Sequence, residues 1–232
     1  MSIASWRFIQ EQSFPKRATI IIICAVVFGA SLTTYVIFMP GNPYIMQVVA
    51  SCIKVPALLF LCPLIALYPT LLISKLFDRG MEARALLKES FSCIVATAIC
   101  LAFCAPCIAI LNSFGNYTIV IFASYGAFAL AGLIGCFAFY SKLIGVGAPS
   151  SSPNFSSRES AMRISATWLV LFGLVGAEVG WSIRPFVGWT GQPFEWIRPD
   201  HTQIWNQLAT EAQNLRVGGL SFPSELEKEY RK

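Results

Sequence analysis

Four cysteines in one apolar stretch are the first residues whose spacing raises the question of chemistry. Cys104 and Cys107 form a C-x-x-C pair, and together with Cys93 and Cys100 they fall on one face of a helix. A redox dithiol needs an accessible thiolate, which apolar surroundings disfavour, and zinc needs four sulfur or nitrogen ligands in a tetrahedral arrangement. We therefore interpret these cysteines as packing residues. Thiol chemistry at Cys104 and Cys107, and ligation of a metal or cofactor, are the alternatives.

Two charged residues, Lys54 and Glu178, interrupt long apolar stretches. A lone charge at the centre of a bilayer costs roughly 2.5–3.5 kcal/mol on insertion scales. We expect the two side chains to face each other, or Glu178 to pair with Arg184, so that an ion pair joins two membrane helices. A proton or solute relay is the functional alternative, and the third is that each charge snorkels to the membrane surface.

Other catalytic patterns lack support in the sequence. The single histidine, His201, lies near the C-terminus beside Asp200, so the predicted spans offer no histidine to a haem iron. No metalloprotease H-E-x-x-H, Ser-His-Asp arrangement, Walker motif or G-x-G-x-x-G is evident. We predict that the protein is not an enzyme and has no cofactor, while an apolar groove between helices would suit a bound lipid or pigment.

The composition indicates that these residues belong to a membrane protein. Hydrophobic residues make up 56% of the chain, charged residues only 12%, and the mean hydropathy is +0.63. Soluble domains carry about a quarter charged residues, which cover their surface. The net charge of +5 does not indicate nucleic-acid binding, because the basic residues lie at the ends of apolar runs and not along a stripe. Membrane lipid is the expected environment.

Five apolar segments have the roughly 20 residues that a membrane helix needs. They are Thr19–Met39, a stretch within Ile45–Phe77, Phe91–Leu111, Thr118–Tyr140 and Ile164–Ile183. The predicted fold is an all-α polytopic bundle of about five spans. Its parts are a cytoplasmic segment at 1–18, a membrane domain at 19–183 and an aromatic-rich extracytoplasmic tail at 184–232.

Basic residues occur in the N-terminal segment and in every second connection between spans, and this alternation predicts the topology. Two connections, residues 40–44 and 112–117, carry no charge. The others carry the basic residues Arg7, Lys16, Arg17, Lys75, Arg79, Arg84, Lys88, Lys142, Arg158 and Arg163. The positive-inside rule then places the N-terminus in the cytoplasm and the C-terminus outside. A bacterial inner membrane is the preferred location, with an organellar or photosynthetic membrane as the alternative.

Prolines in the second segment and small residues in the last two spans predict how these helices pack. The second segment contains Pro56, Pro63 and Pro69, so we expect a kinked or broken helix in the interior of the bundle, where protein satisfies the freed carbonyls. Small residues recur every four positions in the last two spans, which favours close helix packing, with a dimerisation face as the alternative. They are Ala127, Ala131, Gly135, Gly176 and Gly180.

The predicted tail is rich in aromatic residues that suit the membrane surface. Indole rings favour the level of the headgroups, so we expect this stretch to lie on the outer face or to dock onto the helices. Its docking residues are Trp181, Phe186, Trp189, Phe194, Trp196 and Arg198. A short amphipathic helix is expected after Asp200, with Ile204, Leu208, Ala212 and Leu215 on one side.

Several of these stretches resemble the Yip-type integral membrane domain. The resemblance begins at Ile53-Lys54-Val55-Pro56, runs through Tyr68-Pro69 and the turn Phe77-Asp78-Arg79-Gly80, and includes Pro106. The segments Gly173-Leu174-Val175-Gly176-Ala177-Glu178, Trp181, Arg184-Pro185-Phe186-Val187-Gly188 and Pro193-Phe194-Glu195 are similar to uncharacterised bacterial Yip-like membrane proteins. The resemblance implies several closely spaced membrane helices. Eukaryotic members engage trafficking GTPases through a long N-terminal region, whereas only about 18 residues precede the first predicted span here.

The sequence favours a non-catalytic membrane protein that serves as a scaffold, an assembly factor or an accessory subunit of a larger complex. Its partners would be other membrane subunits or a second copy of itself. A small transporter or channel acting as an oligomer is the second interpretation, on the basis of the proline-rich span and Lys54. An intramembrane enzyme using the cysteine face, and a membrane-shaping or trafficking role implied by the Yip resemblance, are the remaining alternatives.

Overall fold

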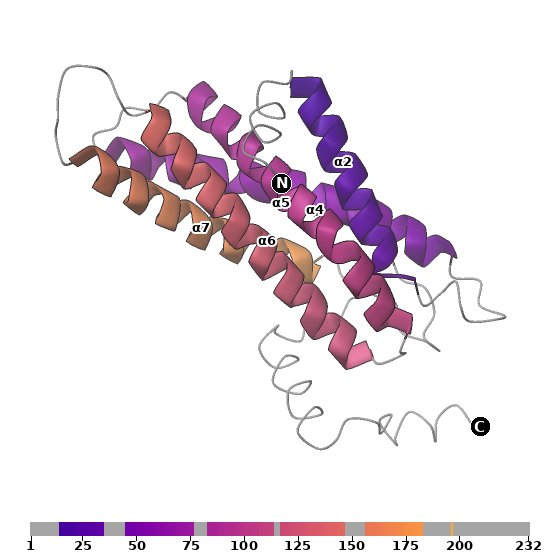
Figure 1. Ribbon diagram of the computed structural model, residues 1–232. Coiled ribbons are helices and arrows are strands. Elements are labelled where there is room, and N and C mark those ends of the chain that lie inside the picture. Colours follow the sequence, from indigo (N-terminus) through magenta and orange to yellow (C-terminus); the bar gives the residue numbers. More distant parts are fainter. Residues whose placement is uncertain are drawn as a thin grey trace, which may run out of the picture.

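Five long helices make up the part of the chain that the computed structural model describes, namely residues 14–34, 45–76, 83–113, 117–146, 156–182 and 196 (Figure 1). The helices are α2 (Phe14–Ser31), α4 (Ile45–Leu76), α5 (Ala83–Ser113), α6 (Tyr117–Val146) and α7 (Ser156–Ser182). These described residues contain no strand. The predicted all-α class is therefore confirmed.

Each of the five helices is long and apolar enough to cross a membrane. The apolar stretches are Phe14–Ser31, Ile45–Ile73, Leu86–Ser113, Ile119–Lys142 and Met162–Gly180. Lipid offers no hydrogen-bonding partner to the backbone, so a helix, which pairs its own amides and carbonyls, is the structure such a stretch adopts. The prediction of an integral membrane protein with five spans agrees with this architecture.

The helix ends differ from the predicted span ends because a helix continues into its polar flanks. The first helix begins at Phe14 and not at Thr19, since Pro15 suits the first turn of a helix, where its missing N–H is not needed. The predicted end of that span, Met39, lies outside the described residues. The third helix begins at Ala83, eight residues before Phe91, because the polar residues in between favour helix as well.

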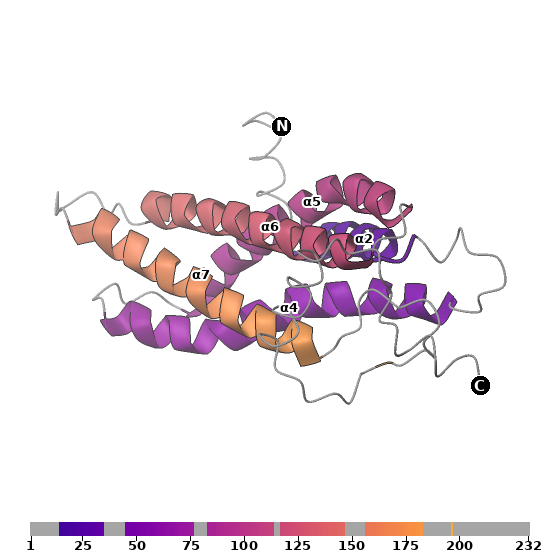
Figure 2. The same cartoon turned by 90° about the horizontal axis from the view of Figure 1, so that it is seen from below.

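The helices alternate in direction and close into a ring. The α5 helix packs most extensively against α6 and α2, while α4 packs against α2 and α7, and α6 against α7. Figure 2 shows α4 and α7 on one side of the molecule and α2 and α6 on the other, with α5 crossing obliquely past α6. The α4–α5 contact is smaller and closes the middle of the bundle. Every helix therefore has at least two neighbours.

The α4 helix is continuous from Ile45 to Leu76, although Pro56, Pro63 and Pro69 all lie inside it. Of the predicted kinked or broken helix, the break does not occur, whereas a kink stays a prediction. Each proline removes one backbone donor, but the bonds on either side remain strong where no water competes for them. The prolines are six or seven residues apart, so intact turns separate them. This helix does pack against three others, as its predicted interior position requires.

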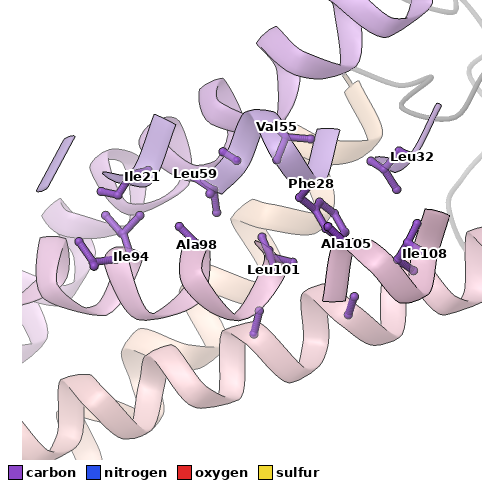
Figure 3. Close-up of a cluster of buried hydrophobic side chains, with 14 of the residues drawn as sticks. Ile21, Phe28, Leu32, Val55, Leu59, Ile94, Ala98, Leu101, Ala105 and Ile108 are labelled. Atoms are coloured by element: carbon purple, nitrogen blue, oxygen red, sulfur yellow. The ribbon is translucent and has the colours of Figure 1, made fainter. Parts of the chain in front are cut away.

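Two groups of buried apolar side chains hold the bundle together. The larger core joins α2, α4, α5 and α6, and Figure 3 shows residues of α2, α4 and α5 meeting within it, among them Phe28, Val55 and Leu101. The smaller core, the four-helix junction, consists of Leu86, Cys93, Phe139, Ile164 and Trp168, with Leu67, Leu71, Tyr140 and Phe172 packed against it. It lies where α4, α5, α6 and α7 meet.

Candidate intramembrane polar site

A row of polar side chains lies buried along the first half of α4. Gln47, Ser51 and Lys54 follow one another at spacings of four and three residues, which places them on a single helix face. Their exposed fractions are 3%, 0% and 6%. The same face continues into Val55 and Leu59 of the larger core. The chain thus buries an ammonium, an amide and a hydroxyl group within a membrane span.

Close contact between α2 and α4 fixes one end of this polar row. A Cβ built on Gly29 would lie 2.6 Å from the backbone oxygen of Ser51 and 3.1 Å from the Cα of Cys52. The Cys52 Sγ donates to the carbonyl oxygen of Val26 at 3.7 Å. Since the obstacle at Gly29 is backbone, no side-chain rotation could make room for a larger residue. Glycine at this position therefore determines how deeply α2 lies against the polar row.

Further buried polar groups occupy the same end of the bundle. The Asn112 Nδ2, at the end of α5, donates to the carbonyl oxygen of Ser31 at 2.9 Å. That carbonyl is at the last turn of α2, where helix geometry leaves acceptors unpaired. Thr33, just beyond α2, has no exposed surface. Polar side chains of α2, α4 and α5 thus gather at one end of the molecule, and Lys54 supplies a positive charge.

The structure places the two predicted charge partners differently. Lys54 is buried, whereas Glu178 is exposed on α7. The α4 and α7 helices do pack together, and a Cβ built on Gly176 would lie 3.9 Å from the Cys62 Sγ. Arg184 lies outside the described residues. The ion pair between Lys54 and Glu178 stays a prediction.

The predicted cysteine face is divided between the interior and the surface. Cys93 is fully buried, Cys100 and Cys104 are partly buried, and Cys107 is exposed. All these thiols are free, and the described residues contain no group of three His, Cys, Asp or Glu side chains that could hold a metal ion. Burial of Cys93 agrees with a packing role. The exposure of Cys107 places this thiol where lipid, and not a neighbouring helix, would surround it.

The glycines predicted to pack between helices have different surroundings. A Cβ on Gly135 would collide with the Thr97 side chain and come within 3.0 Å of the Cys93 Sγ, so α6 approaches α5 closely here. Gly176 has room for a methyl group, and Gly180 is partly buried. Among these glycines, the structure shows two helices in close contact at Gly135.

The predicted docking residues fall mostly outside the described residues. Trp181 lies in the last turn of α7, and Trp196 is 48% exposed. Phe186, Trp189, Phe194, Arg198 and the amphipathic helix expected after Asp200 are not among the described residues.

Several residues that join the helices were not singled out by the sequence. Arg17 was interpreted as a topology signal, yet its side chain is 7% exposed and donates to the Ser92 Oγ at 3.2 Å. Gly29 lies four residues after Ala25, but we looked for this spacing of small residues only in the last two spans. Asn112 looked like part of a connecting loop. Arg17 and Asn112 are polar residues at the margins of apolar runs, where such residues are common in membrane proteins.

The polar row combines an ammonium, an amide and a hydroxyl group, and Gln47, Ser51 and Lys54 all have interaction partners within the structure. Lysine offers three donors and no acceptor, and glutamine and serine add one amide and one hydroxyl. No protein-family model, curated protein or solved structure matches the chain. Comparison with known proteins therefore suggests no function for these residues.

Proposed function

We propose that the protein is a non-catalytic subunit of a larger membrane complex, serving as a scaffold or accessory component. The observation that carries this proposal is the position of α7, which has the smallest buried share of the five described helices and packs mainly against α4 and α6. Its outward face exposes Val170 and Leu174 at 59% and 61%. An outlying helix of this kind offers a partner helix a long apolar face.

The proposal predicts a companion protein in fixed proportion. The native complex is purified in mild detergent after a photo-crosslinking amino acid has been placed at Leu174 on α7 or, as the control, at Phe103 on α5, which is 71% exposed. A single protein crosslinked from Leu174, with lipid adducts alone from Phe103, is the expected result. Lipid adducts from both positions, with no stoichiometric companion, would count against a subunit role.

A small solute-binding or transport protein is the second candidate, favoured by the burial of Lys54 beside Ser51 and Gln47. Buried charges in membrane spans often lie on solute paths. The purified protein is heated with inorganic phosphate or acetate, and with buffer alone. Stabilisation by an anion that Lys54→Arg retains and Lys54→Met loses would favour this candidate. An unchanged melting temperature with every anion would favour the subunit.

The resemblance to the Yip-type domain implies several closely spaced membrane helices, with a membrane-shaping or trafficking role as the alternative. A bacterial inner membrane, with the N-terminus in the cytoplasm and the C-terminus outside, is the proposed location, on the basis of the basic connections.

A further inference from the structure

Three polar atoms in the bundle are buried with no hydrogen-bond partner among the described residues. They are the Ser90 Oγ, the Ser165 Oγ and the Trp168 Nε1. The three residues are 1%, 3% and 0% exposed. A buried polar group that lacks a partner is strongly disfavoured, and more so in a membrane, where water cannot replace the missing bond. Such a group in a native structure calls for an explanation, and a bound water or ion that pairs with it is one.

The contrast with the other buried hydroxyl groups makes these serines unusual. Thr70, Thr97 and Ser124 each donate to the carbonyl oxygen one turn earlier in their own helix, at 2.7, 3.2 and 2.6 Å. Such a bond is the ordinary way in which a helix satisfies a buried hydroxyl. Ser90 and Ser165 do not make it, although both lie within regular helices with the corresponding carbonyl available. Their hydroxyls are therefore free to bond elsewhere.

The three groups lie on two of the helices that form the four-helix junction. Ser165 and Trp168 are three residues apart, so they share one face of α7. Ser90 lies on α5 between Leu86 and Cys93, one turn from each, and both of these residues pack in the same apolar cluster as Trp168. The Cys136 Sγ donates to the Ser165 carbonyl oxygen at 3.5 Å, which ties α6 to the same point of α7. Polar groups of two helices thus border one apolar cluster.

The indole ring of Trp168 is held in place by its aromatic neighbours. It stacks on Phe139 with ring centroids 5.0 Å apart and on Phe172 at 4.7 Å, with interplanar angles of 29° and 8°. The ring is therefore fixed between two others, and its N–H points in a set direction. Because an indole N–H only donates, its partner has to be an acceptor such as an oxygen.

We propose that the four-helix junction binds a small oxygen-bearing ligand that accepts a hydrogen bond from the Trp168 N–H and exchanges hydrogen bonds with the hydroxyls of Ser165 and Ser90. The oxygen belongs to a trapped water molecule or to the carbonyl group of a lipid-soluble compound. Entry requires a small outward displacement of α7, whose main contacts among the described helices are with α4 and α6. The ligand then links α7 to α5, two helices that are not among the closely packed pairs of the described bundle.

The test observes the indole N–H directly. Full-length protein with ¹⁵N-labelled tryptophan is placed in nanodiscs of phosphatidylethanolamine and phosphatidylglycerol, and the Trp168 signal is assigned by its loss in Trp168→Phe. A hydrogen-bonded chemical shift is expected. Magnetisation transfer from water identifies a trapped water, whereas a bound mass in native mass spectrometry that Trp168→Phe loses identifies a carbonyl ligand. An indole shift typical of a free N–H, with no transfer from water, overturns the proposal.

A matched pair of serine variants provides a second measurement that keeps the aromatic stack intact. Ser165→Ala should move the Trp168 indole signal and lower the melting temperature by about 2–4 °C. Ser124→Ala, which removes a hydroxyl satisfied within its own helix, should leave the indole signal unchanged. If Ser165→Ala raises the melting temperature, the hydroxyl is an unsatisfied group and no ligand is bound there.

Discussion

At the level of single residues, two side-chain hydrogen bonds determine how α2 lies along α5. Arg17 reaches Ser92 near the start of both helices, and Asn112 reaches Ser31 near their ends. The two helices therefore run in the same direction. Apolar faces slide past one another easily, whereas a donor and an acceptor in lipid have few alternative partners. The two bonds therefore fix the position of α2 along α5, which the apolar contacts alone would not determine.

The Arg17–Ser92 bond leads to the first prediction, for which the variant is Ser92→Ala. The Ser92 hydroxyl accepts from Arg17 Nη1 at 3.2 Å and donates to the Lys88 carbonyl oxygen at 3.3 Å. Interhelical bonds in membranes contribute about 0.6 kcal/mol on average and at most about 1.7 kcal/mol, and the charge on arginine favours the upper part of this range. A melting temperature lower by about 2–6 °C is expected, measured by thermal unfolding in detergent.

Ser113→Ala is the control for that variant. Ser113 lies on the same helix, is exposed, and bonds only to carbonyl oxygens of its own last turn, at 2.6 and 3.5 Å. Its loss should leave the melting temperature nearly unchanged. Equal effects of the two substitutions would mean that the bond between α2 and α5 adds nothing to stability.

The second prediction concerns the Gly29→Ala substitution. The added methyl group would meet the backbone of Ser51 and Cys52, so α2 and α4 would have to separate. Overpacking of this kind costs typically about 1–3 kcal/mol. Gly132→Ala, with no heavy atom within 4 Å of the new Cβ, is the matched control and should be neutral or stabilising. Thermal unfolding of both variants is the measurement, and a stable Gly29→Ala protein would contradict the close contact.

The sequence predicted some of these residues and missed others for identifiable reasons. Gly135 belongs to a repeat of small residues, and Lys54 is a charge in an apolar run, so pattern alone drew attention to both. Gly29 depends on which face of α4 approaches it. Ser90, Ser165 and Trp168 are ordinary residues for a membrane helix. Only the packed structure shows that their polar atoms are buried without a hydrogen-bond partner among the described residues.

At the level of the elements, α4 shows that proline content does not decide whether a membrane helix is interrupted. The helix continues past three prolines, and the hydroxyl of Thr70 donates to the Ala66 carbonyl oxygen at 2.7 Å in the same region. Such side-chain bonds add to the pairing of the backbone near a proline. The neighbouring helices hold the rest of α4 in place, since it packs against α2, α5 and α7.

The third prediction tests this continuous helix with Pro69→Ala. In an uninterrupted helix the new backbone N–H reaches the carbonyl oxygen of Ile65 and restores one turn. The melting temperature should rise, because a proline inside a helix is less favourable than alanine by about 3 kcal/mol. A fall in the melting temperature would mean that the bundle depends on a bend at this proline.

The existence of each helix could be predicted because about twenty apolar residues in succession have few other structures available in lipid. The ends could not, since the residues that flank a span, such as Arg84 and Lys88 before Phe91, favour a helix equally well in water. The length of an apolar run therefore corresponds to the thickness of the membrane core, and the helix itself can be longer.

At the scale of the whole molecule, the alternating helices gather the basic flanks at one end of the bundle. That end contains the start of α2 with Lys16, the start of α5 with Lys88, and the start of α7 with Arg163. The end of α2 and the end of α5, which precede the two uncharged connections in the sequence, lie at the opposite end. A strong difference in charge between the two ends is what the positive-inside rule needs to orient a protein.

The fourth prediction is therefore the topology itself. Alkaline phosphatase, which is active only outside the cytoplasm, is fused after Gly80, Gly115 or Ser150. Activity is expected from the fusion after Gly115 alone, because the other two connections are basic. Activity from the fusion after Gly80 or Ser150, with none after Gly115, would reverse the orientation.

The order of helices in the ring could not be predicted from the sequence, because each helix is apolar on most of its faces. A soluble helix reveals its inner side by a polar outer face, whereas lipid accepts apolar residues as readily as the core does. The polar row of Gln47, Ser51 and Lys54 is the exception that identifies an inner face.

The unequal lengths of the apolar stretches have a consequence for the membrane that surrounds them. The stretch in α4 has 29 residues and that in α2 only 18, which correspond to about 44 and 27 Å of helix. A bilayer core of about 30 Å matches α2 and is too thin for an upright α4. The long helix has to tilt, or the lipid around it has to thicken. The fit of this protein to its bilayer therefore varies with acyl-chain length, and membranes of different thickness would retain it to different extents.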